Sequence, residues 1–125
     1  MRRRTGIILL ALALLAATAA TTARAGVPAN GTAVGVGERE FTISPYRTTV
    51  PKGLVRFNVT NFGEDGHNLT VVRASDGKTL ASSPEIRSEK QFTLGVTLKR
   101  AGTYRLYCTI AGHKALGMKS KIRVK

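Results

Sequence analysis

The sequence predicts an all-β fold, a β-sandwich or barrel that forms one domain. Residues 54–61 alternate strictly, with Val55, Phe57 and Val59 on one side and polar residues on the other, which is typical of a half-buried strand. Other short β-rich runs are separated by turn signals such as Pro51-Lys52-Gly53. No amphipathic helical stretch longer than a turn or two stands out. Short strands at this spacing favour two antiparallel sheets packed face to face.

The expected elements follow in chain order. Residues 26–37 are rich in glycine and are expected to form a flexible N-terminal segment before a domain of residues 38–125. Strands are then expected at residues 38–44, 48–50, 54–61, 67–73, 90–98, 102–108 and 118–124, with a loop at 61–66 and a turn at 75–78. Residues 83–90 are the one candidate for a short helix. A mature chain of about 100 residues suits one domain with a modest core.

The N-terminus has the pattern of an export signal. Three arginines at residues 2–4 precede an apolar run at 7–20, and Ala23-Arg24-Ala25 matches a small-x-small cleavage site. We therefore expect residues 1–25 to be a signal peptide that directs the mature protein to the periplasm, the cell envelope or the exterior. An uncleaved membrane anchor is the alternative, although the run is shorter than the ~20 residues that span a bilayer. The arginine run leaves Sec and twin-Arg export both open.

The composition makes the single cysteine informative. The chain has one cysteine, two histidines and two methionines, of which Met1 is the initiator. Loss of residues 1–25 removes four arginines and lowers the net charge from +13 to +9. Export leads to an oxidising compartment, where an unpaired cysteine is unusual. Intermolecular pairing or a solitary buried thiol are alternatives, but metal ligation explains Cys108 better because His113 and Met118 follow at ligand-like spacing.

The remaining soft metal ligands of the mature chain form one set: His67, Cys108, His113 and Met118. Two imidazoles and a thiolate in a trigonal plane, with a weak axial thioether, are the ligands of a blue-copper electron-transfer site. Zinc could occupy the same residues, but a thioether is a poor zinc ligand. The set therefore favours one type 1 copper ion that cycles between Cu(I) and Cu(II).

Strand parity places three of these four residues inside the sandwich. Successive side chains on a strand point to opposite faces, so residues two apart share a face. The face-sharing apolar residues are Leu69 and Val71 for His67, Tyr104 and Leu106 for Cys108, and Ile122 and Val124 for Met118. Each of the three ligands also stands at the end of an expected strand. His113 would then reach the site from a loop in which Gly112 and Gly117 permit tight bends.

The pattern Gly66-His67-Asn68, followed by Tyr107-Cys108 and then His113 and Met118 in a Cys-x4-His-x4-Met spacing, resembles the cupredoxins, the small blue copper proteins. The spacing is similar to that of rusticyanin and auracyanin, whereas the His-Asn pair is similar to plastocyanin. The resemblance covers nearly the whole mature chain and implies a cupredoxin-like Greek-key β-sandwich. It also implies that Asn68 hydrogen-bonds to Thr109 and so ties the two ligand-bearing segments together.

The resemblance further implies where redox partners dock. The loop around His113 offers a patch for docking in Ala111, Lys114, Ala115 and Leu116. A mature charge of +9 is expected to steer the protein toward acidic or membrane-associated redox proteins, or toward an anionic membrane surface. The alternative is that outward charges only keep the protein soluble. Nucleic acid is not an expected partner, because no loop clusters arginine with aromatic residues, and a monomer is expected.

The resemblance favours an exported protein that carries single electrons between redox partners. The alternative is a copper-binding carrier or resistance protein that buffers or delivers the metal without relaying electrons. A Met-rich or His-rich tail would favour the carrier, and the chain has none. Two histidines and one cysteine cannot build a second copper centre, so no multicopper enzyme, and no other enzymatic activity, is expected.

Overall fold

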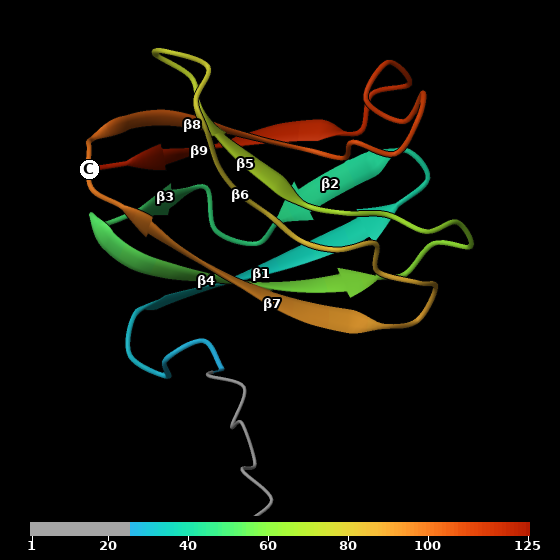
Figure 1. The fold of residues 1–125 in the computed structure, drawn as a ribbon, viewed down its shortest axis with the longest axis horizontal. Coiled ribbons are helices and arrows are strands. Elements are labelled where there is room, and N and C mark those ends of the chain that lie inside the picture. Colours follow the sequence, from blue (N-terminus) through green and yellow to red (C-terminus); the bar gives the residue numbers. More distant parts are fainter. Residues whose placement is uncertain (1–25) are drawn as a thin grey trace, which may run out of the picture.

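The computed structural model describes residues 26–125, and the expected signal peptide at 1–25 lies outside this range. The described residues form two sheets packed face to face (Figure 1). One has the order β2-β1-β4-β7 and the other the order β3-β9-β8-β5-β6. The strands are β1 (Thr32–Arg39), β2 (Thr42–Pro45), β3 (Thr49–Val50), β4 (Gly53–Asn61), β5 (Thr70–Arg73), β6 (Thr79–Ser82), β7 (Gln91–Leu98), β8 (Gly102–Tyr107) and β9 (Lys119–Val124). The predicted all-β sandwich is confirmed.

The core lies between the sheets, where the alternating apolar residues meet. Val55, Phe57 and Val59 of β4 have no exposed surface, while Asn58 between them is exposed. The facing sheet and Leu69, which precedes β5, contribute further fully buried side chains, among them Val71, Tyr104, Leu106, Ile122 and Val124. Burial of these side chains removes apolar surface from water and so holds the two layers together. The parity expected for the strands of both sheets is confirmed.

The sheets are mixed rather than antiparallel throughout. β1 pairs with β4 in parallel, and β3 pairs with β9 in parallel, whereas the other strand pairs are antiparallel. The expectation of two antiparallel sheets was wrong in these two pairs. Neither pair joins strands that are consecutive in the chain, and sequence neighbours alone do not reveal such pairings.

The N-terminal boundary also differs from the expectation. Residues 26–37 were expected to be flexible, and the domain was expected to begin at residue 38, but β1 begins at Thr32 and pairs with β4 over its length. The glycines serve close packing: a Cβ at Gly35 would lie 2.6 Å from the Tyr46 ring. The expected strand at 38–44 is two strands, β1 and β2, separated by a turn at Glu40 and Phe41.

Two further segments differ from the prediction made from the sequence. The strand expected at 67–73 begins only at Thr70, and His67 instead forms an isolated antiparallel bridge with Ile86. Residues 83–90, the candidate helix, are therefore partly extended, and residues 26–125 contain no helix. Strand β6 was not anticipated. No helix in the described range is long and apolar enough to cross a membrane.

Candidate metal centre

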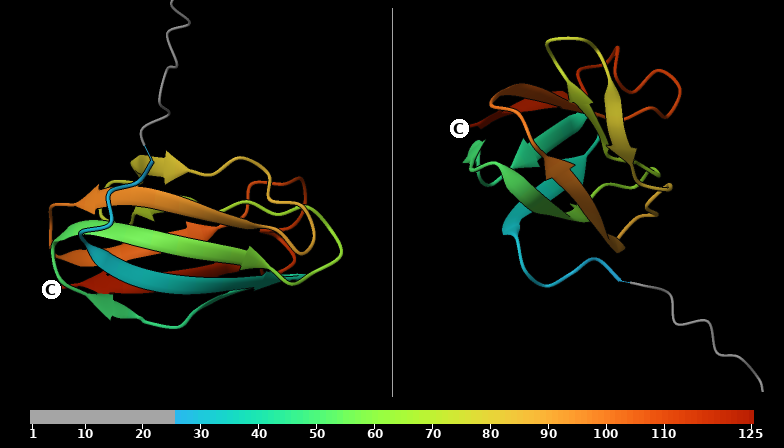
Figure 2. Two further views of the ribbon diagram at one scale, coloured as in Figure 1. Left: turned by 90° about the horizontal axis from the view of Figure 1, so that it is seen from below. Right: turned by 60° about the vertical axis from the view of Figure 1, so that its left-hand side comes forward.

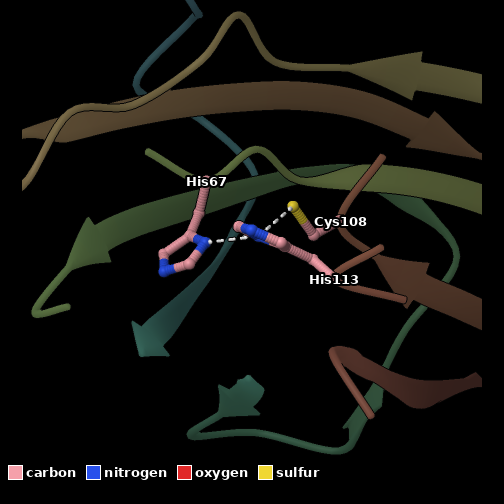
Figure 3. Close-up of side chains that lie close together, drawn as sticks. All are labelled: His67, Cys108 and His113. Atoms are coloured by element: carbon pink, nitrogen blue, oxygen red, sulfur yellow. Dashed lines mark hydrogen bonds between the residues drawn. The ribbon is translucent and has the colours of Figure 1, made fainter. Parts of the chain in front are cut away.

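Three of the four proposed ligands converge at one end of the sandwich. Nδ1 of His67 lies 3.2 Å from Nδ1 of His113, and that nitrogen lies 3.8 Å from Sγ of Cys108 (Figure 3). The ligand atoms of all three residues lie within 4.8 Å of one another. His67 and Cys108 are fully buried, and His113 is 9% exposed. The loop that carries His113 stands at the end of the sandwich opposite the C-terminus (Figure 2).

Backbone hydrogen bonds fix each ligand. His67 is held by the bridge to Ile86, whose N–H donates to the His67 carbonyl at 2.6 Å while the His67 N–H donates to the Ile86 carbonyl at 3.1 Å. Cys108 is the residue after β8, and its N–H donates to the carbonyl of Met118 at 3.2 Å. The Met118 N–H in turn donates to the carbonyl of His113 at 3.1 Å. The ligand positions therefore belong to the folded scaffold.

The loop between β8 and β9 closes tightly because two of its residues are glycines with positive φ. Gly112 has φ 83° and Gly117 has φ 109°, in the left-handed region that other residues rarely adopt. These two glycines let the loop turn the His113 side chain back toward Cys108 instead of into solvent. The expectation that Gly112 and Gly117 permit tight bends is confirmed.

Met118 is fully buried in the hydrophobic core. Its backbone joins Cys108 and His113 through the two hydrogen bonds just described, so it stands next to both in the fold. This placement agrees with its predicted inward face, although a buried methionine is also an ordinary core residue.

The separations of the three ligand atoms fit one metal ion. Bonds of about 2.0 Å to nitrogen and 2.3 Å to sulfur span roughly 3.5 Å between two nitrogens and roughly 3.7 Å from nitrogen to sulfur in a trigonal plane. The observed separations of 3.2 Å and 3.8 Å are close to these values. A buried thiol beside two imidazoles is also the donor set that copper prefers. The three residues fit a single type 1 copper ion.

The thiol of Cys108 must lose its proton to bind a metal. Burial raises the pKa of Cys108, while hydrogen bonds from the backbone at Asn68 and Ile110 act in the opposite direction. The free thiol is therefore protonated at neutral pH, and metal binding releases a proton. The same backbone groups then stabilise the thiolate.

A reciprocal pair of hydrogen bonds links the two ligand-bearing segments. The side-chain amide of Asn68 donates to the Thr109 hydroxyl at 2.6 Å, and the Thr109 N–H donates to the Asn68 side-chain oxygen at 2.7 Å. Because Asn68 follows His67 and Thr109 follows Cys108, this pair fixes the distance between the two ligands. The hydrogen bond expected from the resemblance is present.

Two residues of the site were missed by sequence reasoning, and they are neighbours in the turn between β1 and β2. Glu40 Oε1 lies 3.0 Å from Nε2 of His67. The ring of Phe41 packs edge-on against His113, with 5.1 Å between ring centroids. Each imidazole therefore has its own support from this turn. Nothing in the local sequence pairs the turn with the histidines, because the contacts depend on β1 lying beside β4.

The residues expected to dock partners lie on the surface around His113. Ala111, Lys114 and Ala115 are exposed, and the large apolar side chain of Leu116 is 62% exposed. The ammonium of Lys114 stands 4.1 Å from the centroid of the Tyr107 ring. An apolar patch with one cation at its edge therefore surrounds the ligand that is nearest to solvent.

The sequence matches a known family. Residues 30–125 match the family of copper binding proteins described as the plastocyanin/azurin family. A blue copper protein of Pisum sativum is 34% identical over 67 residues, which are 54% of this chain and 35% of that protein. The match thus spans about a third of the length of that relative.

Solved structures share the fold at low sequence identity. Reduced auracyanin from Roseiflexus castenholzii superposes with a TM-score of 0.66 at 20% identity, covering 80% of this chain and 99% of that one. Rusticyanin from Thiobacillus ferrooxidans gives a TM-score of 0.60 at 21% identity, covering 77% and 79%. A purple cupredoxin from Nitrosopumilus maritimus gives 0.51 at 19% identity, covering 76% and 100%. The cupredoxin fold expected from the sequence is confirmed.

Proposed function

Because the chain belongs to the plastocyanin/azurin family of copper-binding proteins, we propose that it is an exported carrier that passes single electrons between redox partners. The observation that supports this most is the convergence of His67, Cys108 and His113 in a buried site held by the backbone. A site whose ligands are fixed by the fold changes little between oxidation states, and small rearrangement favours fast electron transfer. No reaction is catalysed in this role.

Copper, when bound, supplies a one-electron Cu(I)/Cu(II) couple. Cys108, His67 and His113 would hold the ion, and Met118 is proposed as a fourth, weak ligand that would tune its potential. The hydrophobic core around Met118 and the near-complete burial of the histidines keep water away. Asn68 and Thr109 hold the two ligand segments at a fixed separation.

The first experiment is the visible absorption and electron paramagnetic resonance spectrum of the mature protein after one equivalent of Cu(II). We expect an intense thiolate-to-copper band and narrow parallel hyperfine splitting. The variant Cys108→Ala should lose this band while its circular dichroism remains that of a β protein. Colour that survives in Cys108→Ala, or an ordinary tetragonal Cu(II) spectrum in the native protein, would contradict the proposal.

The axial position has its own test. Met118→Gln should keep a blue-type spectrum but show a lower reduction potential, because an oxygen ligand favours Cu(II) over Cu(I) more than a thioether does. An unchanged potential would mean that Met118 is a core residue and not a ligand.

A copper carrier that delivers the metal is the second candidate. Nearly complete burial of the ligands argues for the relay, since a delivery site has to present its metal to an acceptor. A reversible voltammetric wave with slow loss of copper to a Cu(I) chelator is the result expected for the relay. Rapid copper loss to the chelator without a reversible wave would favour the carrier.

We further propose that partners are acidic proteins. A groove of about 770 Å³ runs over β8 and β9 beside the His113 loop, and its lining includes Arg105, Lys114, Lys119 and Lys121. Arg105 and Lys121 stand directly opposite each other on β8 and β9. Like charges in that position destabilise a sheet, so the pair does not help the fold, and its place in the groove favours a role in binding.

The partner proposal is tested by stopped-flow oxidation of the reduced protein with hexacyanoferrate(III), an anionic acceptor. The double variant Arg105→Glu/Lys121→Glu should react more slowly at low salt, and the difference should shrink at high salt. The matched control is Lys52→Glu/Lys99→Glu, which changes net charge equally in turns at the opposite end of the sandwich. Equal slowing in both would mean that only net charge matters.

Export itself is proposed from the sequence of residues 1–25. The test is N-terminal sequencing of the protein recovered from its native host. A mature N-terminus near Gly26 is the expected result, and a retained Met1 would favour the membrane anchor.

A further inference from the structure

The two imidazoles of the site differ in what holds their outer nitrogen. In His67 the inner nitrogen, Nδ1, faces the other ligands, and the outer one, Nε2, lies 3.0 Å from Oε1 of Glu40. For Nε2 of His113, no hydrogen-bond partner is found within residues 26–125. Only His67 therefore has an anion behind it.

The contact determines which nitrogen of His67 carries the proton. A carboxylate accepts hydrogen bonds and donates none, so Nε2 must be the protonated nitrogen that donates to Glu40. Nδ1 then presents a bare lone pair to Cys108 and His113, which is the tautomer that a metal requires. The ring is fully buried, so no solvent competes for Nε2.

A backbone N–H holds the Glu40 carboxylate in place. The N–H of Asp65 donates to Glu40 Oε1 at 2.8 Å. The oxygen that accepts this hydrogen bond is the one that contacts Nε2 of His67, so the carboxylate is fixed against the ring. A Cβ at position 63 would lie 2.6 Å from Glu40 Oε2 and still nearer to Oε1, so Gly63 leaves the space in which the carboxylate sits.

The segment that supplies these supports is also ordered. The side chain of Asn61 donates to the carbonyls of Asp65 and Ile86 at 2.7 and 2.9 Å and accepts from the Gly63 N–H at 2.8 Å. Ile86 is the residue whose backbone holds His67. A loop that only covered the core would not need to fix one carboxylate against one ring nitrogen in this way.

We propose that Glu40 is a positioning residue of the copper site, which holds His67 in its metal-binding tautomer and shifts the redox equilibrium toward Cu(II). The inference rests on the proposed function. A fixed negative charge behind a ligand increases the basicity of that ligand and favours the more positive oxidation state. Glu40 is 31% exposed, so water weakens this effect without removing it.

The test compares Glu40→Gln with Asp76→Asn. Both variants remove one negative charge from a partly exposed side chain; Asp76 pairs with Arg73 in the turn between β5 and β6. At a fixed ambient potential, Glu40→Gln should raise the ratio of Cu(I) to Cu(II) severalfold. A tenfold change in this ratio corresponds to a shift of about 59 mV in the reduction potential of a one-electron couple. Asp76→Asn should leave the ratio unchanged. Equal shifts in both variants, or no shift in Glu40→Gln, would overturn the proposal.

A measurement on the metal-free protein separates this inference from the proposed function. Imidazole nitrogen chemical shifts should show His67 as the Nε2-protonated tautomer in the native protein and as a mixture in Glu40→Gln. Glu40→Asp keeps the charge but shortens the side chain, so it should also mix the tautomers. Native tautomers in both variants would overturn the positioning role. If copper gave no blue site, the proposed function would fail while this measurement still decided what Glu40 does.

Discussion

Glu38 and Glu40 are two residues apart at the end of β1, and their surroundings are opposite. Glu38 is fully buried, its carboxyl oxygens have no hydrogen-bond partner within residues 26–125, and burial raises its pKa to about 7. Glu40 stands at the rim, where an N–H and an imidazole meet its carboxylate and its pKa falls to about 2. The same type of side chain is thus destabilised as an anion within β1 and stabilised in the turn that follows it.

The difference separates two regions of the molecule. Around the ligands, the polar side chains of Asn61, Asn68 and Glu40 each take part in at least two hydrogen bonds. In the interior, the Glu38 carboxyl group is buried without a hydrogen-bond partner among the described residues. Substitutions should therefore have opposite consequences in the two regions. Removing a polar side chain from the network of hydrogen bonds around the ligands should lower the free energy of unfolding. Replacing Glu38 with a residue that cannot ionise should preserve the free energy of unfolding at high pH.

The largest effect is expected at Asn61. Asn61→Ala removes three hydrogen bonds and leaves the buried Gly63 N–H without its partner, while the Ile86 carbonyl keeps the His67 N–H. We expect a loss of about 3–4 kcal/mol in the free energy of unfolding, because each hydrogen bond contributes about 1 kcal/mol and an unpaired buried group costs about 1–3 kcal/mol. Urea unfolding of the metal-free protein measures it. Asn58→Ala, at an exposed position of the same strand, is the control and should cost much less. Equal losses would mean that the network adds no stability.

A somewhat smaller effect is expected from the ionisation of Glu38. The folded protein binds this proton more tightly than the unfolded chain, whose ordinary pKa is 4.5. The free energy of unfolding should therefore fall as the pH rises from 4.5 through about 7. The full loss is about 3 kcal/mol, at about 1.4 kcal/mol for each unit of pKa.

The side chain in Glu38→Gln cannot ionise, so this part of the pH dependence should disappear in the variant. The stability of the variant relative to the native protein should therefore be higher at pH 9 than at pH 5. Glu40 acts in a separate range, since its lowered pKa means that its contribution is present above pH 4.5 and is lost as the pH falls toward 2. Urea unfolding across pH 4–9 measures both proteins. A native slope that persists in Glu38→Gln would show that another group titrates there.

The convergence of three proposed ligands could be predicted from the sequence, and their supports could not. Cys108, His113 and Met118 stand close together in the chain, and with His67 they are the only soft ligands after residue 25. Inventory and strand parity were therefore enough to propose all four, and the structure brings His67, Cys108 and His113 together. Glu40 is 27 residues from His67, and the contact exists because β1 lies parallel to β4.

The prediction for β1 was wrong for a related reason. Its glycines suggest flexibility, but at Gly35 the Tyr46 ring fills the space that a side chain would need. Composition cannot distinguish a glycine that frees the chain from one that admits a neighbour, because the neighbour is distant in sequence. Val34 and Val36, which alternate with the glycines and are buried, were the available signal for a strand.

The smallest effect is expected at Asn68, at the margin of the network. Asn68→Ala removes two hydrogen bonds to Thr109 in a partly buried place, so a loss of about 1–2 kcal/mol is expected. Thr109→Val removes only the hydroxyl and keeps the backbone N–H bond, so it should cost about half as much. Urea unfolding of the metal-free protein gives both values. If the ligand segments are joined mainly by this pair, the Asn68→Ala protein should also bind copper less tightly than Thr109→Val. Identical copper affinity in the two variants would mean that the β8–β9 hydrogen bonds alone hold Cys108 in place.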